Sequence, residues 1–201
     1  MEPRIVCGVD PSLTSTGLAR ISGYQIFDTA LIKTSGKADV PYRERSGRIT
    51  HIASGIADFC AGADLVVIEG PSFRSVSTST WERAALFYRC LEYFTNNSTP
   101  FAVAPPKSAK KWASGSGTAS KDAVMDCLIN VFGDFYAPSF DVSDALALAG
   151  MGAHYLGYIA PKGKNRLRAL KGVQWPLTPP EQRLSENAVK PRIYPQAYKA
   201  Y

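Results

Sequence analysis

The first apolar run of this 201-residue chain ends in an acidic residue, Asp10. Residues 5–10 read IVCGVD, and a turn of Pro, Leu, Ser and Thr residues follows at 11–16. The apolar run predicts a buried strand, where an unpaired charge is costly. Asp10 therefore either lies in water at the strand end or binds something positively charged, and this stretch alone leaves both alternatives open.

The composition is that of a soluble globular domain, with 45% hydrophobic and 20% charged residues. No unbroken apolar stretch reaches the roughly 18 residues of a membrane span, and the chain enters its first strand at once, so we expect neither a membrane segment nor a signal peptide. Four widely separated cysteines, without CxxC spacing, predict no zinc site and no disulfide framework: Cys7, Cys60, Cys90 and Cys127. This cysteine usage is typical of the cytoplasm.

The positive charge is concentrated at the C-terminal end of the chain. Residues 161–201 carry nine Lys or Arg and two Asp or Glu, whereas the whole chain has a net charge of only +6. We therefore predict a near-neutral domain over residues 1–160 and a basic, Pro-rich extension over residues 161–201. Such an arrangement favours a nucleic-acid partner, and a merely solubilising tail is the alternative.

Periodicity predicts an α/β fold. Three strands joined by short turns, at residues 5–10, 17–21 and 24–31, should pair antiparallel. Two buried strands follow at 64–69 and 101–104, and helical spacing is found at 42–61, 80–94, 121–131 and 144–155. The extension allows a short helix near 166–171. The helix at 80–94 has apolar residues on more than one face, which predicts a second buried contact and hence a homodimer.

Carboxylates end several of these predicted core elements. Asp10 and Glu69 each end a strand, and Asp141 and Asp144, three residues apart at the start of the last core helix, share a face. Strand ends in an open α/β sheet meet at one crevice. Two carboxylates about 4 Å apart repel by roughly 4 kcal/mol at an effective dielectric constant near 20. In a cluster of four, either some carboxylates are protonated or hard divalent cations lie among them, and oxygen ligands without Cys or His point to Mg²⁺ or Mn²⁺. Two such ions can support phosphodiester cleavage.

Each carboxylate also has an ordinary structural explanation when it is taken alone. Asp141 or Asp144 can cap a helix and interact with its dipole, and Glu69 can simply end its strand. The joint pattern favours the metal site, because every one of these residues lies at the end of an element that otherwise belongs in the core.

A basic, glycine-containing segment, PPKSAKKWASGSGTASK, covers residues 105–121. We predict a loop that binds phosphate through its small residues and its lysines: Lys107, Lys110, Lys111 and Lys121. The segment lacks the spacing of a Walker A loop, so no nucleotide cofactor is expected. Lysines on a loop can also be merely solvated.

Taken together, these motifs resemble the RuvC family of Holliday junction resolvases, within the ribonuclease H-like superfamily. GVDPSLTSTGLA is similar to the family's GIDPGxxxTGxA, and LVVIEGPSF to its second acidic motif. PKSAKKWASGSGTASKDAV resembles its VK-x4-GxGxAxK segment, and DVSDALALA its DxxDALAxA. The resemblance covers residues 4 to 157 and keeps the order of the motifs.

The resemblance implies a mixed ribonuclease H-like sheet flanked by helices, and a Mg²⁺-dependent endonuclease acting on branched DNA. It implies metal ligation by Asp10, Glu69, Asp141 and Asp144, and contact of Lys121 with DNA near the scissile phosphate. Further DNA contacts are expected at Ser12, Phe73, Arg74, Lys107, Lys110 and Lys111.

Three features depart from the family pattern. Ser12 stands where the family usually has Gly, Phe73 follows Glu69 by four residues instead of three, and the extension is longer than in bacterial members. Such variation is typical of phage-encoded members with relaxed junction selectivity, which would place the protein in the cytoplasm of a bacterium or a phage-infected host cell.

Two other functions remain open from the sequence. The first is a structure-specific DNA-binding protein without catalysis, which the basic extension and the altered segment after Glu69 would suit. The second is an actin-like ATPase or kinase, because DPSLTSTG also resembles a phosphate-binding turn. The short chain and the lack of a second phosphate motif argue against the ATPase.

Overall fold

The computed structural model describes residues 4–36, 39–71, 79–133, 135, 137–159 and 163–176. Its centre is a five-stranded sheet with the strand order β3-β2-β1-β4-β5. The strands are β1 (Ile5–Asp10), β2 (Ser15–Ser22), β3 (Gln25–Lys33), β4 (Leu65–Glu69) and β5 (Phe101–Ala104). β1, β2 and β3 pair antiparallel, and β4 and β5 continue the sheet parallel to β1. The predicted mixed sheet of three antiparallel strands followed by two parallel strands is confirmed.

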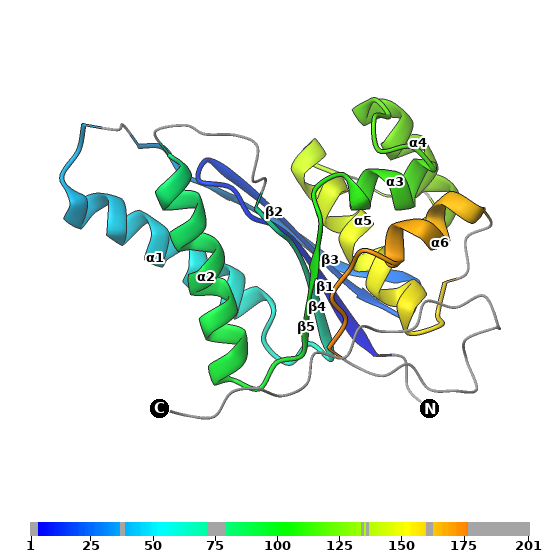
Figure 1. Ribbon diagram of the computed structural model, residues 1–201, viewed down its shortest axis with the longest axis horizontal. Coiled ribbons are helices and arrows are strands. Elements are labelled where there is room, and N and C mark those ends of the chain that lie inside the picture. The colour runs from blue at the N-terminus through cyan, green and yellow to red at the C-terminus, as the bar shows by residue number, and fades with distance from the viewer. Residues whose placement is uncertain are drawn as a thin grey trace.

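Helices cover both faces of this sheet (Figure 1). The helices are α1 (Tyr42–Phe59), α2 (Thr80–Asn96), α3 (Ser108–Ser114), α4 (Lys121–Phe132), α5 (Phe140–Tyr155) and α6 (Lys164–Leu170). α1 and α2 lie on one face and α3 to α6 on the other. Side chains alternate along β1, so Cys7 and Val9 enter the α1–α2 core, whereas Val6 enters the core that α5 covers. Both faces of the central strands are therefore buried, as their apolar runs predict.

Several elements differ from the sequence-based predictions. The segment 105–121, predicted as a loop, contains helix α3, because Ala109, Trp112 and Ala113 bury an apolar face that the glycine signals obscured. α5 begins at Phe140 and not at residue 144, so that Asp141 lies inside its first turn. The Ser139 hydroxyl caps this helix by accepting a hydrogen bond from the Val142 N–H at 3.3 Å. β2 begins two residues earlier than predicted, at Ser15.

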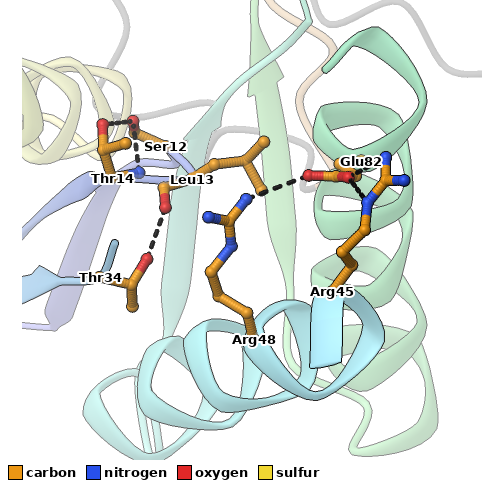
Figure 2. Close-up of polar contacts among 7 residues, drawn as sticks. All are labelled: Ser12, Leu13, Thr14, Thr34, Arg45, Arg48 and Glu82. Atoms are coloured by element: carbon orange, nitrogen blue, oxygen red, sulfur yellow. Dashed lines mark hydrogen bonds and ion pairs between the residues drawn. The ribbon is translucent and has the colours of Figure 1, made fainter. Parts of the chain in front are cut away.

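The two helices on the α1–α2 face are joined by an ion pair network around Glu82 (Figure 2). Glu82 in the first turn of α2 pairs with Arg45 and, at 3.0 Å, with Arg48, both on α1. All three side chains are largely buried, with 12–20% of their surface exposed. On the same helix, Trp81 and Tyr88 are 84% and 66% exposed, so α2 carries aromatic surface that the described chain does not cover.

The described part of the extension, residues 163–176, packs on the domain. Leu170, Val173 and Trp175 are buried in the core below α5. The predicted domain boundary after residue 160 stays a prediction. Among the residues described, no helix has both the length and the apolar character that crossing a membrane requires.

Candidate active site

The first two carboxylates lie at the ends of neighbouring parallel strands. Val9 of β1 is in register with Ile68 of β4, so Asp10 and Glu69, the residues that follow, end their strands side by side. Alternation places both side chains on the face of the sheet that α5 covers, the same face as Gly8 and Val67. The convergence of strand ends that the sequence predicts is therefore present.

Two glycines let α5 approach these strand ends closely. A Cβ atom on Gly8 would lie 1.9 Å from the Ala145 carbonyl oxygen, and one on Gly17 would lie 2.0 Å from the Asp141 carbonyl oxygen. The helix backbone therefore rests directly on the backbones of β1 and β2, where no side chain fits. This contact brings the acidic N-terminal end of α5, with Asp141 in its first turn and Asp144 just after it, to the end of β1 that carries Asp10.

The carboxylates interact electrostatically. Burial, followed by the charges of Asp144 and Asp141, raises the pKa of Asp10 to about 7. Burial, followed by the charges of Asp10 and Asp144, raises the pKa of Glu69 to about 8. Burial also raises the pKa of Asp144. The structure thus brings Glu69, Asp141 and Asp144 close to Asp10, in a setting that penalises the negative charge of Asp10, Glu69 and Asp144.

Lysines on α3 and α4 partly offset this charge. The charge of Lys110 lowers the pKa of Asp10, Glu69 and Asp144 and so acts against burial. The charge of Lys121 does the same for Asp10 and Asp144. Lys121 is the first residue of α4, and its Nζ lies 5.0 Å from the centroid of the Phe140 ring. Both lysines were predicted from the sequence, whereas Phe140, which is 41% exposed beside Lys121, was not.

The turn between β1 and β2 is closed by hydroxyl groups. The Ser12 hydroxyl accepts hydrogen bonds from the backbone N–H groups of Thr14 and Ser15, at 3.3 and 3.5 Å. The Leu13 carbonyl accepts one from the Thr34 hydroxyl at 2.5 Å, as Figure 2 shows. Ser12 therefore fixes the shape of the turn that follows Asp10.

Ser15 reaches across to the acidic turn of α5. Its hydroxyl donates a hydrogen bond to Oδ2 of Asp141 at 2.5 Å. The sequence reasoning missed this residue, because nothing in the local sequence links a serine at the start of β2 to an aspartate 126 positions later.

The remaining predicted DNA contacts are distributed around this centre. Lys110 and Lys111 are half-buried on α3, and Lys107 is exposed immediately before it. Phe73 and Arg74 lie outside the described residues.

The donor chemistry of the cluster suits a hard divalent cation, because it consists of carboxylate oxygens that destabilise one another without one. Over the residues that the structure describes, no group of three or more His, Cys, Asp or Glu side chains is already arranged to hold a metal ion. One donor atom, Oδ2 of Asp141, is engaged by Ser15. Cation binding would therefore require the side chains to reorient on a backbone that is already in place.

Comparison with known proteins gives a relative by sequence and several by fold. No family model matches the chain. A RuvC crossover junction endodeoxyribonuclease from Chloroherpeton thalassium is 26% identical over 182 residues, covering 85% of this chain and 92% of that protein.

Solved structures show the same fold. RuvC of Thermus thermophilus in complex with a Holliday junction matches with a TM-score of 0.61 and 22% identity, over 73% of this chain and 90% of that one. The yeast mitochondrial Holliday junction resolvase Ydc2 matches with a TM-score of 0.50 and 15% identity, over 72% and 75%. The chain is therefore similar in sequence to a RuvC endonuclease, and it shares the fold of the solved RuvC structures.

Proposed function

We propose that the protein is a Mg²⁺-dependent, structure-selective endonuclease that cleaves Holliday junctions or related branched DNA. The observation that carries the proposal is the meeting of Asp10, Glu69 and the acidic turn of α5 at one edge of the sheet. The similarity to a RuvC endonuclease over most of both chains supports it. The short chain, whose sequence shows no second phosphate motif, speaks against the alternative of an actin-like ATPase.

The cation site would be formed by Asp10, Glu69, Asp141 and Asp144. Bound divalent ions would activate a water molecule and stabilise charge on the leaving 3′ oxygen of the cleaved phosphodiester. The carboxylates suit this role because they lie at the ends of rigid elements, which keeps their backbone positions fixed. Ser15 donates a hydrogen bond to Oδ2 of Asp141 and would share or release this oxygen when a cation binds.

Positive side chains around the carboxylates would hold the DNA strand. Lys110 and Lys121 act on the carboxylates electrostatically, so a phosphate at the site would feel both charges. Lys121 begins α4, where the positive end of the helix dipole adds to its own charge. These groups would orient the scissile phosphate towards the carboxylate edge of the sheet.

The test is cleavage of a labelled four-way junction in the presence of Mg²⁺. We expect Asp10→Asn to lose more than about 100-fold in rate, since removing a ligand costs several kcal/mol of transition-state stabilisation and about 1.4 kcal/mol is tenfold. Asp126→Asn, at an exposed position of α4, is the matched control and should cleave normally. If wild type and Asp10→Asn are equally inactive on junctions, flaps and forks, the endonuclease proposal is wrong. Binding without cleavage under every divalent ion would favour a non-catalytic junction-binding protein.

We also propose that the enzyme acts as a homodimer through α2. The exposed Trp81 and Tyr88 support this, as does a hollow of about 460 Å³ between α1 and α2 beside Tyr88. A second copy would cover this aromatic surface and place two catalytic sites in one particle. Tyr88→Glu should convert the dimer to a monomer in light scattering without unfolding it, because the side chain is exposed. A wild-type mass equal to that of one chain would contradict the dimer.

A further inference from the structure

Helix α6 presents a row of cations that the proposed catalytic site does not use. Residues 163–176 contain four Lys or Arg and no Asp or Glu. Three of the four, Lys164, Arg168 and Lys171, are exposed. In the part of the chain that the structure describes, none of these three forms an ion pair.

The row is anchored firmly by the opposite side of the helix. Ala169, Leu170 and Val173 are buried, and the Arg166 guanidinium donates a hydrogen bond to the Ala113 carbonyl of α3 at 2.7 Å. Immediately beyond, the Trp175 ring stacks on Tyr155 with centroids 4.1 Å apart and planes 3° apart. The extension is thus fixed to α3 and α5, and the side chains that do not anchor it are held at defined positions.

The spacing of the row separates it from the anchoring side. The residues that face inward recur at the spacing of one helix face: Arg166, Ala169, Leu170 and Val173. Lys164, Arg168 and Lys171 follow at intervals of four and three residues, so they share the other side of α6. At 1.5 Å per residue the row spans about 10 Å, which corresponds to the axial rise of about three phosphates along one DNA strand.

The row also lies next to the catalytic edge. Figure 1 shows α6 beside α3, on the face of the sheet that α5 covers. Lys110 of α3 acts on Asp10, Glu69 and Asp144, and Ala113, which holds α6, follows it by about one helical turn. A duplex that leaves the carboxylates across α3 would therefore meet α6 next.

We propose that Lys164, Arg168 and Lys171 bind the phosphate backbone of a duplex arm of the DNA substrate, on the flank of the cleaved position. A regular polyanion fits the row better than a protein partner does. Among the described residues, the exposed large hydrophobic side chains that a protein interface would use all lie on other elements. This inference rests on the proposed function, because it places an arm of the same substrate.

The experiment compares a triple alanine variant of Lys164, Arg168 and Lys171 with a control of equal charge change. The control replaces Arg4, Lys33 and Arg43, three exposed cations outside α3 to α6, by alanine. Affinity for a four-way junction with arms of about 20 base pairs is measured in EDTA over a series of salt concentrations. We expect the slope of log affinity against log salt to fall by about 2 to 3 for the α6 variant, at roughly 0.9 per lost phosphate contact. The control should change it by less than about 1.

A junction with arms of about 5 base pairs, closed by hairpin loops so that the short arms stay paired, provides the second measurement. With no duplex to reach α6, wild type and the α6 variant should have the same slope on it. An unchanged slope on the long-arm junction, or an equal fall in the control, would overturn the inference even if wild type cleaves junctions. Absence of any junction binding or cleavage by wild type would instead count against the proposed function.

Discussion

Replacing Asp10 by asparagine is expected to stabilise the metal-free protein at alkaline pH while abolishing its proposed activity. The carboxylate of Asp10 is buried beside Glu69, Asp141 and Asp144, and Lys110 and Lys121 offset these charges only in part. An amide has nearly the same shape but never carries the charge. The variant therefore removes the electrostatic penalty and leaves the fold unchanged.

The size of the effect follows from the pKa. For Asp10 the pKa rises from 3.8 to about 7, which at roughly 1.4 kcal/mol per pH unit corresponds to about 4 kcal/mol lost from the folded state at pH 8. Part of this penalty is mutual repulsion that relaxes when a neighbouring carboxyl takes up a proton, and solvent screens part of the rest. We therefore expect Asp10→Asn to gain about 2 kcal/mol.

The direction in which folding shifts the pKa of Asp10 decides whether stability rises or falls with pH. Because the pKa of Asp10 is raised on folding, the folded state holds a proton that the unfolded state releases above about pH 4. Wild-type stability should therefore fall as the pH rises from about 5 to 8, and Asp10→Asn should flatten this fall. Millimolar Mg²⁺ should raise the stability of wild type at pH 8 and have less effect on the variant.

Urea unfolding in EDTA at pH 5 and at pH 8 measures all of this. Asp126→Asn serves as the control, since its exposed side chain should give the same stability as wild type at both values. If Asp10→Asn is no more stable than wild type at pH 8, the charge of Asp10 does not destabilise the folded protein as its raised pKa indicates.

Two further substitutions test how the site is supported. Gly8→Ala should destabilise the protein by about 3 kcal/mol or more, because the new Cβ would meet the Ala145 backbone. Gly47→Ala is the control, since a Cβ there would have nothing within 4 Å. Equal urea midpoints for the two variants would contradict the close contact between α5 and β1. Glu82→Gln should lower the free energy of unfolding by about 1–3 kcal/mol, because it leaves the two arginines of α1 without their counter-charge. Thermal unfolding measures this, with the exposed variant Glu44→Gln as the control. Equal melting temperatures for the two variants would refute a structural role for the network.

The central strands and their carboxylates could be predicted from the sequence because the signals are local. Apolar runs predict β1 and β4, and the acidic residue at the end of each run predicts the edge of the sheet at which both strands end. The helix α3 could not be predicted in this way, because it depends on Trp112, which is fully buried against Gly150 of α5. The glycines and prolines at residues 105–117 predict a loop, and only the long-range contact of Trp112 stabilises a helix there.

The same limit applies to the polar contacts of the site. The hydrogen bond between Ser15 and Asp141 joins residues 126 positions apart, and the Glu82 network joins two helices whose charged faces look merely solvated in the sequence. Periodicity identifies which residues face the core, but it does not identify which polar groups meet across it. The N-terminal extension of α5 to Phe140 depends on the cap by Ser139, which a helix predicted to start at residue 144 leaves out.

The glycines and the carboxylates of this site are two parts of one arrangement. Gly8 and Gly17 allow α5 to touch the strand backbones, and that contact is what holds the acidic turn of the helix against the end of β1. Tight packing there stabilises the fold, while the charges it brings together oppose folding, as the raised pKa values of Asp10 and Glu69 indicate. A chain that kept Asp10 or Glu69 for structure alone would gain stability by losing either of them. Their meeting at the edge where β1, β4 and α5 come together is the reason why we propose a cation that neutralises them.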